Sequence, residues 1–361
     1  MTPDTALADP RIRRVEECIV DFFQRQRSLP GREGLAEIWE AAERLSSGGK
    51  YLRPRLFLAA YEALASDQLH RIDEDQLLAI ATALELLHIS FLLHDDVIDR
   101  DLLRRGEPNV IATAATLASQ RGASAEDARH FGAAAAILVG NAALSEVHRT
   151  FARLDLPRQW QDRLTDLLDR SIAESITGEL NDVALSLGLQ DHDLALVRDT
   201  TRRKTAPYSI ELPLRSAAVL ADAPTEIDQY VGPIAQSIGL AFQLQDDLLG
   251  VFAEPEQHGK ARCADLGERK ETLLIAYARR TPSWPAIEAM LGLPTYDQSA
   301  AAIARGFLVE SGAVHEVEAE IARYLLDAEL GVAALAEQGP GGSALADVLR
   351  VFITRLQGRK S

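Results

Sequence analysis

Three aspartates and two arginines stand close together in one segment: Asp95, Asp96 and Asp99, followed by Arg104 and Arg105. Asp95 and Asp99 are four positions apart, so on a helix they share a face and repel unless a cation lies between them. Carboxylate oxygens suit Mg²⁺, which usually keeps phosphate oxygens in its shell, and guanidinium groups pair with phosphate. The segment indicates a site for a divalent metal and a phosphate-bearing ligand. A solvated helix end followed by a glycine stop would show the same residues.

The element that must position these aspartates is a core helix expected over 74–100. Apolar residues recur before the acidic segment at helical spacing, namely Leu77, Leu78, Ile80, Ala81, Leu84, Leu87, Phe91 and Leu92. A helix C-terminus already carries partial negative charge, so carboxylates there require an offsetting cation. His88 lies on the same face as Asp95 and Asp99. It either faces the same cavity or is an ordinary core histidine.

A glycine turn precedes an earlier helix of the chain, which is expected over 55–66. It contains Gly49 and delivers Lys50 and Arg53 to the helix start. Backbone amides, a helix N-terminus and two cations together favour an anion site. A plain helix-to-helix turn with solvated cations is the alternative.

A second Asp-Asp pair closes another long apolar helix, expected over 225–252. Asp246 and Asp247 stand near its end, as Asp95 and Asp96 do in the first. Two further basic segments accompany this helix. One holds Lys204 and Thr205 just before Pro207, and the other holds Gly259 and Lys260. Together these clusters predict a deep apolar cavity with a polar mouth that accepts a hydrocarbon and diphosphates.

The rest of the chain is expected to be helical. Ala and Leu are plentiful, aromatic residues make up 6%, and no strand-like alternation is evident. The other expected helices cover 11–27, 33–46, 109–119, 127–154, 157–187, 191–205, 207–221, 271–280, 296–311, 314–336 and 342–357. The fold class is therefore all-α.

Composition restricts the class of protein. The formal net charge of −16 argues against a nucleic-acid binder, whose phosphate contacts need a basic surface. The two cysteines, Cys18 and Cys263, form no disulfide framework, which makes a reducing cytoplasm the default. The N-terminus has no signal-peptide core, and the most apolar run, 131–144, is too short to span a bilayer. We expect a soluble cytoplasmic protein without a transmembrane segment.

Taken in order, these segments resemble the motifs of the trans-isoprenyl diphosphate synthases, the polyprenyl synthetase family. The resemblance covers about residues 46–280 and runs through Gly48-Gly49-Lys50-x-x-Arg53-Pro54, Asp95-Asp96-x-x-Asp99 with Arg104-Arg105-Gly106, Lys204-Thr205, Phe242-Gln243-x-x-Asp246-Asp247 and Gly259-Lys260. Such an ordered set is far more specific than one acidic motif. It implies a single-domain isoprenoid-synthase-type helical bundle over 31–361, after an N-terminal helix and frayed tail over 1–30.

The resemblance also implies roles for individual residues. Three Mg²⁺ ions are expected, two on Asp95 and Asp99 and a third on Asp246, with Asp96 and Asp247 completing the acidic set. The allylic diphosphate would be held by Arg104, Lys204, Thr205, Gln243 and Lys260. Isopentenyl diphosphate would be held by Gly49, Lys50, Arg53, His88 and Arg105. A homodimer is typical of the family.

The sequence departs from the family pattern at three positions. Tyr51 stands where an arginine is common, Asn141 where an aspartate is frequent, and Gly250 where the second acidic motif often has a third aspartate. Product length should depend on Ser90 and Phe91, one turn before Asp95. One small and one bulky residue there imply a C15–C20 product, with geranylgeranyl diphosphate ahead of farnesyl diphosphate.

Three other readings compete with this one. A class I terpene cyclase shares the first acidic motif but needs no second diphosphate site, which Lys50, Arg53 and His88 would form. A non-catalytic regulatory subunit would not need both Asp-Asp pairs. A helical scaffold with solvated charges would require several motifs to be coincidences.

Overall fold

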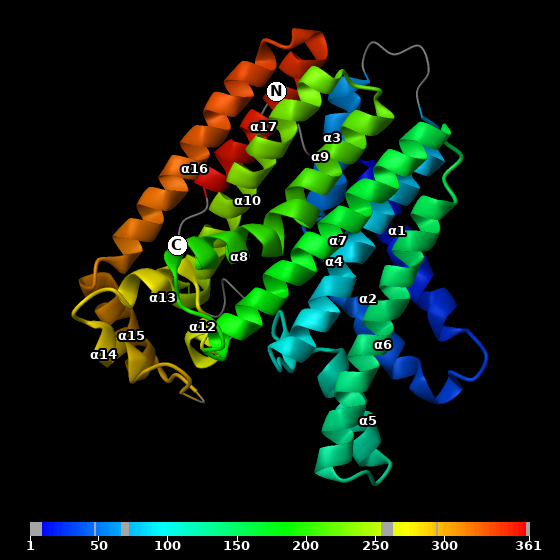
Figure 1. Ribbon diagram of the computed structural model, residues 1–361. Coiled ribbons are helices and arrows are strands. Elements are labelled where there is room, and N and C mark those ends of the chain that lie inside the picture. The colour runs from blue at the N-terminus through cyan, green and yellow to red at the C-terminus, as the bar shows by residue number, and fades with distance from the viewer. Residues whose placement is uncertain (1–8, 47, 66–71, 254–262, 294, 359–361) are drawn as a thin grey trace. The chain divides into compact units, whose positions relative to one another are not determined.

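The computed structural model describes residues 9–46, 48–65, 72–253, 263–293 and 295–358. Within these residues the fold is helical apart from one short hairpin, which confirms the all-α prediction (Figure 1). The described residues form two compact units. The N-terminal unit draws on 7–59 and 70–165, and the C-terminal unit on 60–69 and 166–361. The expected division at residue 30 stays a prediction.

The N-terminal unit is built around α4 (Glu74–Ile98). This helix packs against α6 (Ala125–Ala152) and against α1 (Arg11–Arg27). The other elements are η1 (Glu33–Leu35), α2 (Ala36–Ser46), α3 (Leu52–Leu64), whose later residues belong to the C-terminal unit, and α5 (Val110–Gln120), which packs on α6 and α2. Side-chain caps begin α4, α5 and α6, where Asp73, Asn109 and Ser124 accept from backbone N–H groups of the first turn.

A two-stranded hairpin follows α4, and the sequence did not predict it. β1 (Leu103–Arg104) pairs antiparallel with β2 (Glu107–Pro108). The turn residues Arg105 and Gly106 both have positive φ, 54° and 79°, as a type I′ turn requires. Arg-Gly is not among the favoured pairs for this turn, so the sequence signal was weak. The hairpin holds Arg104 and Arg105 close to the end of α4.

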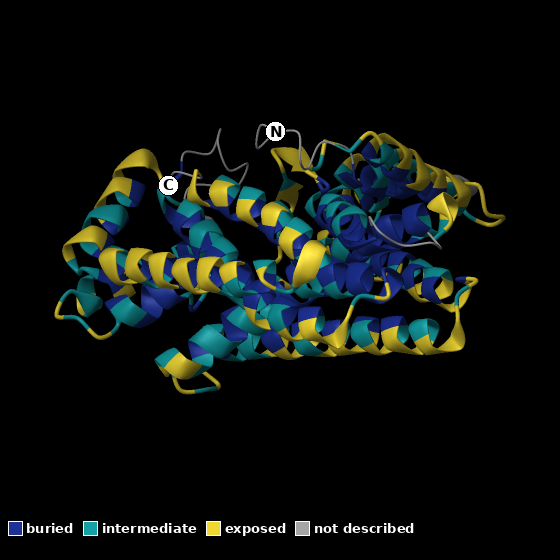
Figure 2. Ribbon diagram, turned by 90° about the horizontal axis from the view of Figure 1, so that it is seen from above, coloured by how far each residue is buried: buried dark blue, intermediate teal, exposed yellow. Residues whose placement is uncertain are grey.

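The C-terminal unit is centred on α10 (Thr225–Phe252). It packs against α16 (Ala313–Ala336), α8 (Leu194–Ala206) and α17 (Gly339–Gln357). The remaining elements are α7 (Arg158–Ser186), of which the later part belongs here, η2 (Pro207–Glu211), α9 (Leu212–Leu220), α12 (Ala264–Gly267), α13 (Leu273–Ala278), α14 (Trp284–Glu288) and α15 (Gln298–Glu310). In Figure 2 buried and exposed residues alternate along the long helices, as expected for amphipathic core helices.

The break between the helices expected over 191–205 and 207–221 takes a specific form. The segment η2 is a π-helix that joins α8 to α9, and Pro207 stands at its first position. Because a proline has no N–H to donate, the α-helical pairing changes there. Lys204 and Thr205 therefore lie in the last turn of α8, just before the change.

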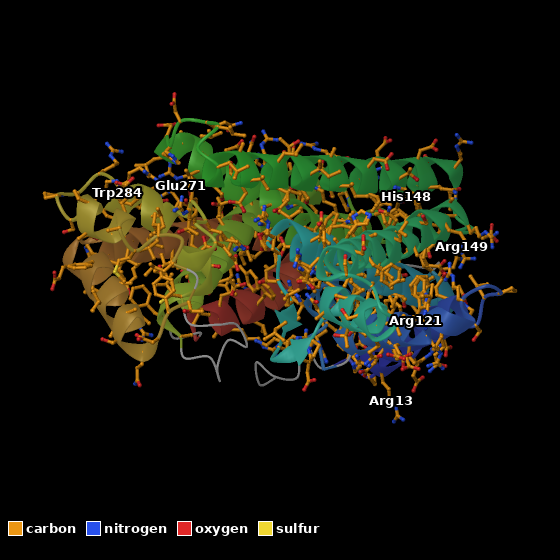
Figure 3. All side chains as sticks on the ribbon, turned by 90° about the horizontal axis from the view of Figure 1, so that it is seen from below. Arg13, Arg121, His148, Arg149, Glu271 and Trp284 are labelled. Carbon is orange, nitrogen blue, oxygen red and sulfur yellow. The ribbon has the colours of Figure 1, made fainter. Side chains whose placement is uncertain are left out.

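Arg279 fastens the segment that follows α12. It donates from Nη2 to Glu271 Oε2 at 2.7 Å, and its guanidinium lies 4.1 Å from the centroid of the Trp284 ring. Figure 3 labels Glu271 and Trp284 at neighbouring positions. These contacts connect the start of α13 to α14, a short helix that the sequence did not predict.

Within the part of the chain that the structure describes, two helices, α4 and α6, are long and apolar enough to cross a membrane by length and mean hydropathy alone. In α4, 72% of the apolar window is buried inside the protein, which is typical of a core helix. In α6 only 39% is buried, and Ile137 and Leu138 are 42% and 66% exposed. The apolar side of α6 is thus accessible in the single chain.

Candidate active site

Asp96 is the structural member of the first acidic motif. Its side chain is 1% exposed and accepts hydrogen bonds from Arg104 Nε at 2.8 Å and from Asn109 Nδ2 at 3.0 Å. Burial raises the pKa of Asp96, and the positive charge of Arg104 opposes the increase. Because Arg104 comes from the hairpin and Asn109 caps α5, Asp96 holds three segments together at the end of α4.

Asp95 and Asp99 are the more accessible carboxylates of this motif. Asp95 is 24% exposed and lies 3.8 Å from Arg104 Nη2, measured from its Oδ2. Asp99 is the C-cap of α4 and is half-buried; its N–H donates to the carbonyl of Asp95 at 2.8 Å. One helical turn separates the two residues, so both side chains lie on one face, as predicted. The pair can therefore offer oxygen ligands to one side of α4.

Four of the residues predicted to bind isopentenyl diphosphate, Gly49, Arg53, His88 and Arg105, lie near one another in the N-terminal unit. A Cβ placed on Gly49 would lie 3.7 Å from Arg105 Nη2 and 3.9 Å from Glu85 Oε1, and Arg53 is buried at the start of α3. The pKa of His88 is held well below its usual value by burial and by the charges of Arg53, Arg104 and Arg105. A neutral imidazole beside these cations can donate one hydrogen bond to an anion without adding repulsion.

Glu85 is the residue of this cluster to which the sequence assigned no role. It is buried on α4, and burial raises its pKa while the charges of Arg53 and Arg105 oppose the shift. Its carboxylate offsets part of the positive charge that gathers here. Its position one turn before His88 was a usable signal, because residues four or three apart share a helix face.

Tyr51, the first departure from the family pattern, is turned away from solvent. It has a φ of +47°, it is buried, and its hydroxyl donates to the carbonyl of Ser46 at 2.7 Å. Burial raises the pKa of this phenol. Tyr51 therefore ties the glycine turn to the end of α2, whereas the neighbouring Lys50 is exposed.

The C-terminal unit places Lys204 between two carboxylates of α7. Its Nζ lies 2.9 Å from Glu179 Oε2 and donates to Asp182 Oδ2 at 2.8 Å. The helices approach closely because Gly178 has no side chain, since a Cβ there would lie 2.5 Å from the backbone nitrogen of Lys204. This arrangement keeps the ammonium group at one place on α8.

A relay of hydrogen bonds links α8 to the second acidic motif. Thr205 Oγ1 donates to Gln243 Oε1 at 2.5 Å, and Gln243 Nε2 donates to Asp247 Oδ1 at 2.8 Å. Close helix contact makes this possible, because a Cβ on Gly239 would lie 2.7 Å from the Cα of Ala206. The relay fixes the orientation of the Gln243 amide.

Asp247 resembles Asp96 in its surroundings. It is buried, and burial raises its pKa to about 8. The negative charge of Asp265 adds to the increase, the hydrogen bond from Gln243 opposes it, and the charges of Asp246 and Asp182 add further. Asp246, by contrast, is half-buried. In both Asp-Asp pairs the second carboxylate is buried and hydrogen-bonded, and the first is more accessible.

Several predicted positions lie elsewhere or cannot be placed. Lys260 falls outside the described residues. Ser90 is buried, and its hydroxyl donates to the carbonyl of Gly140 on α6 at 3.0 Å, whereas Phe91 is half-buried. Asn141 is exposed and lines a shallow hollow on the surface of α6 with Leu144, Ser145 and His148.

The residues present suit Mg²⁺ bound together with a ligand. Among the residues that the structure describes, no group of three or more His, Cys, Asp or Glu side chains is close enough to hold a metal by itself. Mg²⁺ does not need such a cage, because it commonly binds one or two carboxylates and completes its shell with water and substrate phosphates. The accessible carboxylates of Asp95, Asp99 and Asp246 fit that pattern.

Comparison with known proteins gives a consistent result. The sequence model of the polyprenyl synthetase family matches residues 36–305. A geranylfarnesyl diphosphate synthase of Aeropyrum pernix is 28% identical over 287 residues, which cover 78% of this chain and 82% of that protein. A (2E,6E)-farnesyl diphosphate synthase of Mycobacterium bovis is 32% identical over 65% of this chain, and the match spans 60% of that protein.

The fold has a close counterpart among solved structures. The geranylgeranyl pyrophosphate synthase of Corynebacterium glutamicum, complexed with isoprenyl diphosphate and magnesium, superposes with a TM-score of 0.83. The two chains are 26% identical, and the superposition covers 96% of this chain and 98% of the other.

Proposed function

The chain belongs to the polyprenyl synthetase family and is a trans-prenyltransferase, and we propose that it extends an allylic diphosphate by head-to-tail condensation with isopentenyl diphosphate in a Mg²⁺-dependent reaction. The observation that carries this proposal is the matched construction of the two acidic motifs. In each, one aspartate is buried and hydrogen-bonded to a neighbouring residue, while the other remains accessible at the end of a long helix.

We propose that the N-terminal unit binds isopentenyl diphosphate. Arg53 and Arg105 supply fixed positive charge, and Gly49 leaves room beside Arg105 for a diphosphate oxygen. His88 contributes a neutral hydrogen-bond donor. Lys50 is exposed and can close over a bound anion with its flexible stem. Guanidinium groups bind phosphate in a bidentate manner, so the pair of arginines selects a diphosphate over a monovalent anion.

The allylic diphosphate has a separate set of residues. Lys204, Thr205 and Gln243 from the C-terminal unit are proposed to bind it, together with Arg104 and Lys260. Lys204 already has two carboxylate partners, so a diphosphate must compete with Glu179 and Asp182 for the ammonium group. The Thr205 hydroxyl positions the Gln243 amide, which can then donate toward an incoming phosphate oxygen.

Three Mg²⁺ ions are proposed, held by Asp95, Asp99 and Asp246. When bound, Mg²⁺ neutralises charge that develops on the departing diphosphate. Asp96 and Asp247 act as positioning residues, because their carboxylates are already engaged by Arg104, Asn109 and Gln243.

The residues then account for the chemistry of chain extension. The carbon–oxygen bond of the allylic substrate breaks, and its electron pair leaves with the diphosphate, whose charge Arg104 and Lys204 stabilise. The isopentenyl double bond supplies the electrons for the new carbon–carbon bond. A proton is then lost to the released diphosphate. Apolar side chains exclude water, which would otherwise quench the allylic cation.

Geranylgeranyl diphosphate is the proposed product, ahead of farnesyl diphosphate. The relatives named above make farnesyl, geranylgeranyl and geranylfarnesyl products, so family membership leaves product length open. Ser90 is engaged with the backbone of α6, which leaves Phe91 as the side chain that can limit the space for the growing hydrocarbon. A single bulky residue should stop the chain at an intermediate length.

A homodimer is also proposed. Ile137 and Leu138 present apolar surface on α6, a helix otherwise packed against α4 and α5. Covering such a surface with the same surface of a second copy would remove apolar area from water on both chains.

Product analysis tests the proposed function. Purified protein is incubated with Mg²⁺, isopentenyl diphosphate and, in turn, dimethylallyl, geranyl and farnesyl diphosphate, and the products are sized by mass spectrometry. We expect extension to geranylgeranyl diphosphate, and loss of activity in Asp95→Ala and Asp246→Ala. If no primer is extended, the function is wrong; a cyclised hydrocarbon would identify a terpene cyclase instead.

A further inference from the structure

Gly250 is the position where the second acidic motif lacks a third aspartate. It is buried on α10, three positions after Asp247 and four after Asp246, so any side chain there would share their side of the helix. A Cβ placed on Gly250 would lie 3.0 Å from Asp265 Cγ and closer still to Asp265 Oδ2. The carboxylate of Asp265 therefore fills the place that a side chain at position 250 would occupy.

The backbone around Asp265 is fastened on both sides. Cys263 Sγ donates to the carbonyl of Val251 at 3.6 Å, which attaches the start of this turn to the end of α10. Lys270 N donates to the carbonyl of Asp265 at 2.9 Å, and Gly292 N donates to the carbonyl of Leu266 at 2.9 Å. Asp265 is half-buried in this setting. Its carboxylate is held against α10 by these anchors and by the absence of a side chain on Gly250.

This placement gathers like charges at the end of α10. Asp246, Asp247 and Asp265 come from two segments, and the helix C-terminus adds partial negative charge. Glycine at position 250 is what permits the approach, since a side chain there would displace the carboxylate of Asp265. The chain thus has the three acidic residues of a fuller motif, one of them contributed by α12 in place of α10.

From this juxtaposition the geometry points to Asp265 as the third carboxylate of the second acidic motif, a positioning residue that helps Asp246 to retain Mg²⁺ with the diphosphate. The inference rests on the proposed function, because it assigns a further residue to the same site. It predicts that an aspartate at position 250 of α10 can supply the carboxylate equally well when Asp265 is replaced by alanine.

A charge-relocation experiment tests this. Four proteins are compared: wild type, Asp265→Asn, Gly250→Asp, and the double variant Gly250→Asp/Asp265→Ala. The readout is calorimetric binding of inorganic pyrophosphate at a series of Mg²⁺ concentrations, without any turnover. Glu268→Gln serves as the matched control, since it removes an acidic charge from the same segment. Thermal unfolding in the absence of Mg²⁺ reports on the fold of each variant.

We expect Asp265→Asn to raise the Mg²⁺ concentration needed for half-maximal pyrophosphate binding by about tenfold, as loss of a residue that supports a metal ligand commonly does. Glu268→Gln should leave it unchanged. Gly250→Asp alone should lower the unfolding temperature because its side chain meets Asp265, and the double variant should recover both the unfolding temperature and the Mg²⁺ dependence.

Two outcomes would overturn the inference: an unchanged Mg²⁺ dependence in Asp265→Asn, or a double variant that remains as weak as Asp265→Asn. The readouts separate this inference from the proposed function. The wild type could fail to extend any primer while the Mg²⁺ dependence of pyrophosphate binding still requires a carboxylate at position 250 or 265. That result would defeat only the proposed function. If the wild type extends its primers normally and the variants bind pyrophosphate with an unchanged Mg²⁺ dependence, only the role of Asp265 would be defeated.

Discussion

Arg104 donates from Nε to the buried carboxylate of Asp96 at 2.8 Å, whereas its Nη2 lies 3.8 Å from the more accessible Asp95. Two adjacent aspartates thus have different surroundings, one inside the protein and one at its surface. Their substitutions should separate stability from activity.

We predict that Asp96→Ala lowers the free energy of unfolding by about 3 kcal/mol, because it leaves the half-buried Arg104 without its main partner. The matched variant Asp95→Ala should cost less than about 1 kcal/mol, since Asp95 is partly exposed, yet it should abolish Mg²⁺-dependent turnover. Urea unfolding and product assays measure the two effects. Equal losses of stability would contradict the assignment.

The second prediction concerns pH and Asp247. Its pKa in the folded protein, about 8, is above the ordinary value of 3.8. The folded state therefore binds this proton more tightly than the unfolded state does, so stability falls as pH rises between these two values. In the absence of metal, the free energy of unfolding of the wild type should fall between pH 5 and pH 8.5 by on the order of a few kcal/mol more than that of Asp247→Asn. Parallel pH profiles in urea unfolding would refute the raised pKa.

Gly178 allows α7 to touch the backbone of α8 at Lys204. Gly178→Ala would bring a Cβ to 2.5 Å from that backbone nitrogen, and such overpacking costs about 1–3 kcal/mol. The variant should also displace Lys204 and raise the KM for the allylic diphosphate. Gly306→Ala on α15 is the control: nothing lies within 4 Å, so it should stabilise the helix by about 0.5–1 kcal/mol. Thermal unfolding and steady-state kinetics distinguish the two.

Phe91→Ala should lengthen the product by at least one isoprene unit, because it removes the bulky side chain proposed to limit the hydrocarbon. Phe307→Ala on α15 removes a half-buried phenylalanine from another helix and should leave product length unchanged. Mass spectrometry of the products gives the answer. If Phe91→Ala gives an unaltered product, Phe91 does not limit the length of the hydrocarbon.

Leu138→Lys should weaken the proposed dimer by at least about tenfold, since burying an unpaired ammonium costs more than the roughly 1.4 kcal/mol that tenfold represents. Leu330→Lys changes an exposed leucine of α16 and should have no such effect. Analytical ultracentrifugation over a range of concentrations measures both. A wild-type chain that sediments as a monomer would end the proposal.

Local sequence signals predicted most long helices to within a few residues. The helices over 11–27 and 225–252 were predicted with the observed bounds, because proline or glycine and a strong apolar period mark them. The hairpin at 103–108 was missed because its turn places Arg105, which is not a typical turn residue, at positive φ. The short helices α12 and α14 were missed because a single turn has no measurable period.

The sequence by itself determined the helical class, the order of the motifs and the residue types able to bind metal and diphosphate, since these depend on local spacing and on side-chain chemistry. Only the tertiary structure decided which aspartate of each pair is buried. Asn109 reaches Asp96 from the start of α5, and Gln243, four positions before Asp247 on α10, is oriented by Thr205 of α8. The same holds for Asp265 beside Gly250: that contact depends on how the α12 segment folds back on α10, which no local pattern specifies.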